Sequence, residues 1–123
     1  MKKILVVEDD LELAKVLVHR LEASGFEVLV ACDGYEAVAT FHKMKPDLIV
    51  LDILLPAGGG VFVLKTLRAS HHGAFVPVVV LTAMQDPLKK DEIVRSGVDA
   101  YLEKPFEAGE LIKTIEAILA KKG

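Results

Sequence analysis

Acidic residues stand at two places where apolar segments of this sequence end, and carboxylates in such positions are suited to binding metal ions. Glu8, Asp9 and Asp10 directly follow a short apolar segment, and Asp52 interrupts the apolar run 48–55. Asp10 is best interpreted as the cap of a following helix. An unpaired carboxylate in a run such as 48–55 is costly to bury, so Asp52 is expected to have a functional role.

Two further side chains with suitable chemistry follow later apolar segments. Thr82 ends the segment that begins at Val78, and Lys104 comes just after the segment 100–102. Taken singly, Thr82 is more simply a strand-end hydroxyl bonded to its own backbone, and Lys104 a solvated surface lysine. The combination of several acids, a hydroxyl and an ammonium after successive apolar segments is what favours a shared site.

Carboxylates that crowd together repel one another in their charged forms, so such a cluster calls for a cation. A set of oxygen ligands without His or Cys favours a hard ion, Mg²⁺ or Mn²⁺. In phosphoryl transfer, a metal ion and an ammonium neutralise the charge on the transferred group. The residues therefore indicate an arrangement suited to metal-assisted phosphoryl transfer.

The elements that must position these residues alternate regularly along the chain. Short apolar runs, most of them unbroken by polar residues, are typical of strands buried on both faces of a parallel sheet. Segments with helical periodicity lie between them. The predicted strands are 4–7, 28–31, 48–51, 78–81 and 100–102.

The predicted helices have recognisable beginnings and ends. The first is closed by Gly25, the second begins with a capping box at Asp33 and runs to about residue 45, and the third covers 60–69. Asp86 and Pro87 begin a fourth helix that Gly97 closes, and a last helix carries apolar residues from Leu111 to Leu119.

This order, strand then helix five times, predicts an α/β fold with a doubly wound, five-stranded parallel sheet and helices on both faces. In such sheets the functional crevice lies at the carboxyl ends of the strands. The acids, Thr82 and Lys104 all follow strands, so the fold would bring them to one rim.

Composition limits the other classes of function. The 123 residues fit one domain, 1–123, and the single cysteine, Cys32, excludes a disulfide within the chain. The net charge is −3 and the basic residues are scattered, which argues against direct nucleic-acid binding. With neither a signal peptide nor a membrane span in the sequence, a cytoplasmic location is expected.

The motifs resemble the receiver domain of two-component response regulators over essentially the whole chain. The resemblance rests on the acids after the first strand, on Asp52 with Pro56 and Gly60, and on the motifs around Thr82 and Lys104. It implies the flavodoxin-like, CheY-like strand order 2-1-3-4-5. It also implies a phosphorelay signalling domain that catalyses only its own phosphorylation and dephosphorylation.

The resemblance implies roles for the acidic residues. Asp52 matches the phosphorylated aspartate, and Asp9 a direct ligand of Mg²⁺ or Mn²⁺. Glu8 would act on the metal through water, and the backbone carbonyl of Leu54 would be a further ligand together with Asp52.

It also implies roles for residues after the fourth and fifth strands. Thr82 and the amide of Ala83 would bind the phosphoryl group, and Lys104 would pair with it. Tyr101 matches the aromatic switch residue, although an ordinary half-buried strand tyrosine is the alternative. The bond between Lys104 and Pro105 is a candidate for a cis peptide.

The expected partners also follow from the resemblance. The phosphodonor would be a sensor histidine kinase, a phosphotransfer protein or a small phosphodonor, and the face formed by helix 4, strand 5 and helix 5 would act on an output protein or fused output domain. Opposite charges on those helices suggest a phosphorylation-linked homodimer; solvated helix faces are the simpler interpretation. The charged residues concerned are Lys89, Lys90, Arg95, Glu110 and Glu116.

Three other classes of protein share part of this pattern. A flavin-binding protein of the same fold would meet repulsion between its phosphate and Glu8–Asp10. A haloacid-dehalogenase-type phosphatase needs a second acid where Leu54 stands. A pseudo-receiver, which binds partners without being phosphorylated, is harder to exclude, although the complete residue set argues against it. His71 and His72 are interpreted as a solvated pair rather than a metal site.

Overall fold

The computed structural model describes residues 1–55, 59–83 and 87–122 and confirms the alternation of strands and helices. Each observed strand is one residue longer than its predicted apolar run, at one end or the other. The elements are β1 (Lys3–Val7), α1 (Leu11–Ala23), β2 (Glu27–Ala31), α2 (Gly34–Met44), β3 (Leu48–Asp52), α3 (Gly59–Ala69), β4 (Val78–Thr82), α4 (Pro87–Arg95), β5 (Ala100–Glu103) and α5 (Ala108–Lys122).

All strand pairs of the sheet are parallel, and the order is β2-β1-β3-β4-β5, as expected for a doubly wound sheet. Val7 pairs with Leu51, Asp52 with Leu81, and Thr82 with Glu103. The carboxyl ends of β1, β3, β4 and β5 therefore meet at one rim, which is where the sequence places the acids, the hydroxyl and the lysine.

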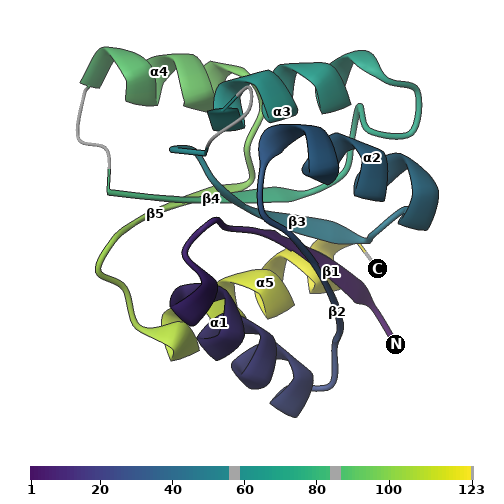
Figure 1. Ribbon diagram of the computed structural model, residues 1–123, viewed down its shortest axis with the longest axis vertical. Coiled ribbons are helices and arrows are strands. Elements are labelled where there is room, and N and C mark those ends of the chain that lie inside the picture. The colour runs from purple at the N-terminus through teal and green to yellow at the C-terminus, as the bar shows by residue number, and fades with distance from the viewer. Residues whose placement is uncertain (56–58, 84–86, 123) are drawn as a thin grey trace.

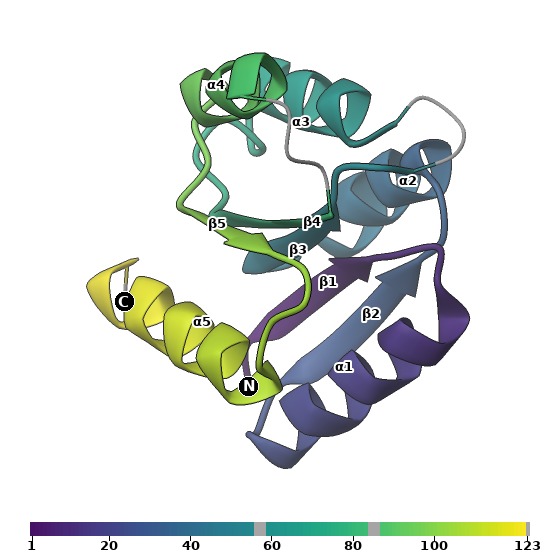
Figure 2. The same cartoon turned by 90° about the vertical axis from the view of Figure 1, so that its left-hand side faces the viewer.

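Helices cover both faces of the sheet, and the core is divided accordingly (Figures 1 and 2). Helices α1 and α5 lie on one face, while α2, α3 and α4 lie on the other. Successive strand residues point to opposite faces, so Leu5 belongs to the core beneath α2 and α3, and Val6 to the core beneath α1 and α5. All five residues of β3 are buried, which explains its unbroken apolar sequence before Asp52.

The caps agree with the local sequence, with one difference. Asp10 accepts hydrogen bonds from the amides of Glu12 and Leu13 at the start of α1. Asp33 Oδ1 accepts from the amide of Glu36 at 2.8 Å. The Glu36 carboxylate, however, accepts from the amide of Cys32 at 2.9 Å, one residue before the cap. The capping box is thus displaced by one residue from its usual pairing.

Left-handed residues end three of the helices. Gly25 has φ 94° and follows α1, and Gly97 has φ 87° and follows α4. Helix α2 ends at Met44, with Lys45 at φ 48° as its C-cap. Helix α4 begins at Pro87 as predicted, and its predicted cap residue, Asp86, lies outside the described residues.

Arg68 holds together the loops at the other end of the sheet. Its guanidinium donates to the carbonyl oxygens of Gly73 at 2.9 Å, Val76 at 2.7 Å and Gly97 at 2.6 Å. Gly73 is closely packed, because a Cβ there would lie 2.3 Å from the carbonyl oxygen of Leu67. The connection between α3 and β4 is therefore fixed at several points.

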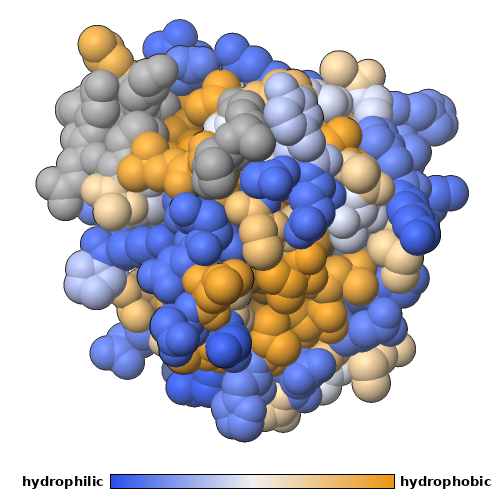
Figure 3. Space-filling model, in the orientation of Figure 1, coloured by the Kyte–Doolittle hydropathy of each residue, from blue (hydrophilic) through white to orange (hydrophobic). Residues whose placement is uncertain are grey.

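An apolar area lies on the surface over the edge strand β2, between α1 and α2 (Figure 3). Leu11, Ala14, Val18 and Val30 line a groove of about 310 Å³ there. Glu8 and Asp52 are not among the residues that line it. Within the described ranges, none of the helices is both long and apolar enough to span a membrane.

Candidate functional site

Lys104 connects two buried carboxylates at the rim of the sheet. Its ammonium nitrogen lies 2.9 Å from Glu8 Oε1 and 3.0 Å from Asp52 Oδ2. The Lys104 amide donates to the Thr82 carbonyl at 2.9 Å, which continues the pairing of β4 with β5 beyond the strand end. The bond between Lys104 and Pro105 is cis. The lysine is therefore positioned by its backbone as well as by its charge.

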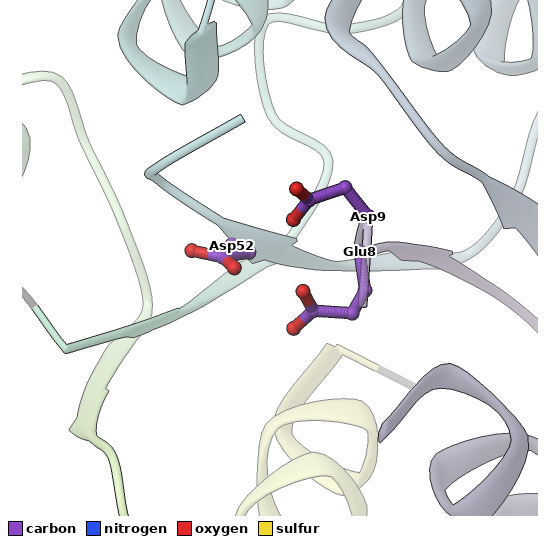
Figure 4. A group of neighbouring side chains, drawn as sticks. All are labelled: Glu8, Asp9 and Asp52. Carbon is purple, nitrogen blue, oxygen red and sulfur yellow. The ribbon is translucent and has the colours of Figure 1, made fainter. Parts of the chain in front are cut away.

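Three carboxylates gather beside this ammonium. Glu8, Asp9 and Asp52 each offer an oxygen atom, and these atoms lie within 4.8 Å of one another. Figure 4 shows Glu8 and Asp9 extending from the chain just beyond β1 toward the end of β3, where Asp52 stands. Glu8 is 1% exposed and Asp52 5% exposed, whereas Asp9 is open to solvent. The cluster thus has a buried floor and an accessible side.

Backbone hydrogen bonds orient the two buried acids. The Glu8 amide donates to the Ala31 carbonyl at 3.0 Å, so the residue still follows the line of β1. The Asp10 amide donates to Glu8 Oε2 at 3.1 Å, and the Leu54 amide donates to Asp52 Oδ1 at 3.0 Å. Each carboxylate therefore has one oxygen bonded to a backbone amide and the other to Lys104.

Burial and neighbouring charges alter the acidity of Glu8 and Lys104. Burial raises the pKa of Glu8 from 4.5 to about 7; the hydrogen bonds from Lys104 and the Asp10 amide oppose this rise, and the nearby Asp52 adds to it. For Lys104, burial by itself disfavours the ammonium, but the hydrogen bonds to Glu8 and Asp52 outweigh it and the pKa is raised. The lysine is therefore a cation at neutral pH, and Glu8 holds a proton more readily than an ordinary glutamate does.

The remaining residues predicted for the site lie along β4 and β5. Thr82 is completely buried at the end of β4 and follows Leu81, the partner of Asp52 in the sheet register. Ala83 follows and is exposed. Tyr101, on β5, is partly buried, and the Lys90 ammonium lies 5.0 Å from the centre of its ring. Thr82 thus comes from the strand next to that of Asp52, and Tyr101 from the strand beyond it.

The structure shows a packing role for Gly60 that the sequence reasoning did not assign. Its amide donates to the Ile53 carbonyl at 2.9 Å, and a Cβ at this position would lie 2.4 Å from Ile53 Cα. This contact brings α3 against the chain directly after Asp52. The available signal was the glycine itself, which permits so close a backbone approach.

The donor set of the cluster fits a hard divalent cation. Mg²⁺ is usually bound by one or two carboxylates and keeps several waters. The oxygens of Glu8, Asp9 and Asp52 converge and Asp9 is open to solvent, so the site offers carboxylate ligands and access for water. Burial is the main reason that the pKa of Glu8 is raised, and a bound cation would favour its charged form again.

The comparison with protein families agrees with this geometry. The family model described as the response regulator receiver domain matches residues 4–116. This chain is a member of that family. The receiver domain thus accounts for nearly all of the residues in the five strands and five helices.

Named relatives are similar along nearly the whole receiver domain. The transcriptional regulatory protein CpxR of Klebsiella pneumoniae is 42% identical over 121 residues, which cover 98% of this chain and 50% of that protein. The DNA-binding response regulator MtrA of Mycolicibacterium paratuberculosis is 38% identical over 98% of this chain and 52% of its own length. The chain therefore spans about half the length of these relatives.

Solved structures show the same fold. The Francisella response regulator 1452 receiver domain superposes with a TM-score of 0.91 at 33% identity, covering 100% of both chains. The receiver domain of the Pseudomonas aeruginosa sensor histidine kinase PA1611 has a TM-score of 0.86 at 30% identity and covers 94% of this chain and 95% of that one. The latter structure is described with a magnesium ion coordinated in its active site cleft.

Proposed function

We propose that this receiver domain accepts a phosphoryl group on Asp52 in a Mg²⁺-dependent reaction and thereby switches an output partner. The observation that carries the proposal is the contact of one ammonium, Lys104, with both Asp52 and Glu8 beside the Asp9 carboxylate. A nucleophilic carboxylate, an acidic metal cluster and a cation for the phosphoryl oxygens are thus brought together. These are the parts that phosphoryl transfer requires.

In the proposed reaction a carboxylate oxygen of Asp52 attacks the phosphorus of a phosphohistidine or of a small phosphodonor. A new P–O bond forms while the P–N bond of the phosphohistidine breaks, and the released imidazole takes up a proton. The product is an acyl phosphate. Lys104, already beside Asp52 Oδ2 at 3.0 Å, would pair with the phosphoryl oxygens.

Asp9 and Asp52, with Glu8 acting through water and the Leu54 carbonyl as a further ligand, would hold the ion. Mg²⁺, or Mn²⁺ in its place, supplies positive charge that stabilises the transferred phosphoryl group. The bond from the Leu54 amide to Asp52 Oδ1 supports this arrangement, because it holds the Leu54 backbone next to the carboxylate. The magnesium described for the PA1611 receiver domain gives support by similarity.

The switch is proposed to involve Thr82, the amide of Ala83 and Tyr101. A phosphoryl group brings negative charge and new acceptor oxygens, and it shifts an equilibrium only through contacts that differ between two states. Thr82 and Ala83 would bind the phosphoryl group, and Tyr101 would change position with them. Tyr101 lies beneath Lys90 of α4, so a change at β5 would reach the face formed by α4, β5 and α5.

A sensor histidine kinase or a phosphotransfer protein is the proposed donor. Beside Lys104, a groove of about 220 Å³ is lined by side chains of α1 and of the segment that leads into α5. Val16 of α1 is 53% exposed there. An apolar groove next to Lys104, whose ammonium contacts Asp52, is a suitable docking surface for the donor protein. We place this exchange in the cytoplasm. The groove is lined by Leu13, Val16, Leu17, Lys104, Pro105, Phe106 and Ala108.

The output is proposed to lie outside residues 1–123, which we take as one receiver domain. The named relatives include DNA-binding response regulators about twice as long as this chain, and an output protein or fused output domain would fill the same role here. A homodimer linked to phosphorylation stays a prediction. Two basic residues expected to face a second copy have acidic neighbours in the same chain. The Lys90 ammonium nitrogen lies 3.9 Å from Glu103 Oε1. Arg95 Nη2 lies 4.0 Å from Asp91 Oδ2.

The test is incubation of the purified protein with Mg²⁺ and acetyl phosphate or phosphoramidate, followed by intact mass measurement. We expect the mass to increase by one phosphoryl group, and we expect no increase for Asp52→Asn. Asp10→Asn is the matched control, because Asn caps a helix as well as Asp does and Asp10 belongs to the cap rather than to the acceptor.

An adduct that persists in Asp52→Asn would overturn the assignment of the acceptor. A wild-type protein that binds Mg²⁺ but forms no adduct with any donor would instead be a pseudo-receiver. Failure both to bind Mg²⁺ and to form an adduct would remove the proposed function altogether.

A further inference from the structure

Two histidines from distant parts of the chain meet on the surface, apart from the acidic cluster. His42 lies near the end of α2 and His72 in the connection between α3 and β4, thirty residues later. His42 Nδ1 and His72 Nε2 are 3.1 Å apart, and both side chains are exposed. The sequence pattern drew attention to His71 and His72 as neighbours, whereas the spatial partner of His72 is His42.

The two rings are held in place by their surroundings. The His72 ring stacks on the buried ring of Phe41, with centroids 5.2 Å apart and an interplanar angle of 13°. The His42 ring stands almost perpendicular to the His72 ring, at 86°. Both rings therefore lie against or beside a residue of the core, and they are already neighbours before a ligand binds.

The backbone that carries His72 is also fixed. The next residue, Gly73, donates its amide to Ser70 Oγ at 3.1 Å and accepts a hydrogen bond from Arg68 at 2.9 Å. His42 is part of the regular helix α2. A ligand pair on rigid elements keeps its geometry better than one on free loops.

We propose that His42 and His72 form a binding site for a transition-metal ion of the Zn²⁺, Ni²⁺ or Cu²⁺ kind. Imidazole nitrogens are preferred ligands of these ions. With metal–nitrogen distances of about 2.0–2.1 Å, two nitrogens in neighbouring positions around one ion lie roughly 2.9–3.4 Å apart. The separation of 3.1 Å between Nδ1 of His42 and Nε2 of His72 falls within that range.

Binding requires only small adjustments at these two side chains. The ring that donates the hydrogen bond must move its proton to its other nitrogen, so that both facing nitrogens present lone pairs. Both rings must also turn so that these lone pairs converge on the ion, and their exposure leaves room for this. Among the described residues, no third side chain lies close enough to the two histidines to form a group of three ligands. Water molecules would therefore complete the coordination of the ion.

The site differs in chemistry from the cluster at Glu8, Asp9 and Asp52. That cluster offers only oxygens and suits a hard ion, whereas the histidine pair offers nitrogens to a softer one. The two sites should therefore be occupied together, by different ions. An ion held between α2 and the α3–β4 connection would also stabilise the native state, because it binds only where both segments are folded.

The experiment is a calorimetric titration of the untagged protein with Ni²⁺ in excess Mg²⁺, accompanied by thermal unfolding with and without Ni²⁺. We expect one equivalent of Ni²⁺ to bind and to raise the unfolding temperature. His42→Gln and His72→Gln should each weaken Ni²⁺ binding by about tenfold or more, since one of the two ligands is lost. His71→Gln is the matched control, an exposed histidine in the same connection, and should bind as the wild type does.

Circular dichroism of the variants separates loss of a ligand from loss of the fold. Equal Ni²⁺ affinity in the wild type, His42→Gln and His72→Gln would overturn the proposal, and so would the absence of binding by the folded wild type. Binding that depends on Asp9, measured with Asp9→Asn, would assign the ion to the acidic cluster instead and would also contradict it. A loss in His71→Gln equal to that in His42→Gln would overturn the proposed pair.

Discussion

The ammonium nitrogen of Lys104 lies 3.0 Å from Oδ2 of Asp52, although 52 residues separate the two in sequence. The same ammonium lies 2.9 Å from Oε1 of Glu8. One cation thus compensates two buried acids, and it must share them with any metal ion that binds there. Lys104 consequently has opposite effects on the proposed metal site and on the proposed phosphoryl group.

Replacing Lys104 by Met should therefore strengthen Mg²⁺ binding and weaken phosphorylation. Because the ammonium contacts the same carboxylates that would hold the ion, removing its positive charge should raise the Mg²⁺ affinity roughly tenfold or more. The yield of phosphorylated protein should fall, because the cation proposed to pair with the phosphoryl oxygens is lost. Calorimetry with Mg²⁺ and intact mass after acetyl phosphate treatment measure the two effects, with the exposed Lys113→Met as control. Weaker Mg²⁺ binding in Lys104→Met would contradict this account of the lysine.

Mg²⁺ affinity should depend on pH through Glu8, whose pKa is raised by burial to about 7. Below that pH the carboxyl holds a proton that competes with the ion. Lowering the pH from 8 to 6 should weaken Mg²⁺ binding by about tenfold. Glu8→Gln should bind Mg²⁺ less tightly at high pH and lose most of this dependence. A wild-type affinity that is constant from pH 6 to 8 would show that Glu8 is already ionised throughout.

The same carboxyl should make stability depend on pH in the absence of Mg²⁺. Its pKa is higher in the folded state, about 7, than its ordinary value of 4.5, so the folded state binds the proton more tightly. The resulting stabilisation is fully present below pH 4.5 and is lost as the pH rises through about 7. Urea unfolding at pH 5 and pH 8 should show this loss in the wild type and not in Glu8→Gln. A matching loss in both proteins would assign the effect to another group.

Gly60→Ala should destabilise the domain and disturb the site. A methyl group there would lie 2.4 Å from Ile53 Cα, so either α3 or the chain after Asp52 must move. We expect a loss of about 1–3 kcal/mol in the free energy of unfolding and a lower rate of phosphorylation. Gly109→Ala is the control within α5, because nothing lies within 4 Å of its added methyl. That control should be neutral or stabilising by about 0.5–1 kcal/mol.

Arg68→Met should destabilise the domain at the end opposite to the acidic cluster. It would remove the hydrogen-bond donors of the Gly73, Val76 and Gly97 carbonyls, at a cost of about 1–3 kcal/mol. Arg68→Lys should recover little of the lost stability, because an ammonium cannot reproduce the planar arrangement of donors in the guanidinium. Arg95→Met, at an exposed ion pair of 4.0 Å, should change the unfolding free energy by less than about 0.5 kcal/mol. A wild-type free energy of unfolding in Arg68→Lys would show that the planar guanidinium is not required.

The sequence predicted the sheet well because its signals are local. Unbroken apolar segments identified the strands, and the caps at Asp10 and Asp33 identified two helix starts. The acids were placed at the rim because carboxyl ends of parallel strands meet there. The structure brings together Glu8, Asp52 and Lys104 as that rule requires; their roles in phosphorylation stay predictions.

The contacts that the sequence did not reveal join distant segments through single side chains. The Arg68 guanidinium reaches loops up to 29 residues away, and the His42–His72 pair spans 30 residues. Neither contact produces a periodic pattern in the sequence, because a single residue at each end is enough to form it. The close packing of Gly60 on Ile53 likewise depends on the angle at which α3 meets the sheet, which no local propensity defines.

The order in which the rim residues occur along the chain has a consequence for protein synthesis. Lys104 is separated from Glu8 by 96 residues and completes the contacts with both acids. A chain still on the ribosome therefore has Asp52 and the acids of β1 long before it has the ammonium that joins them. A polypeptide interrupted before β5 would lack this group. If phosphorylation proceeds as proposed, such a truncated product would take up a phosphoryl group poorly and would therefore not send a false signal.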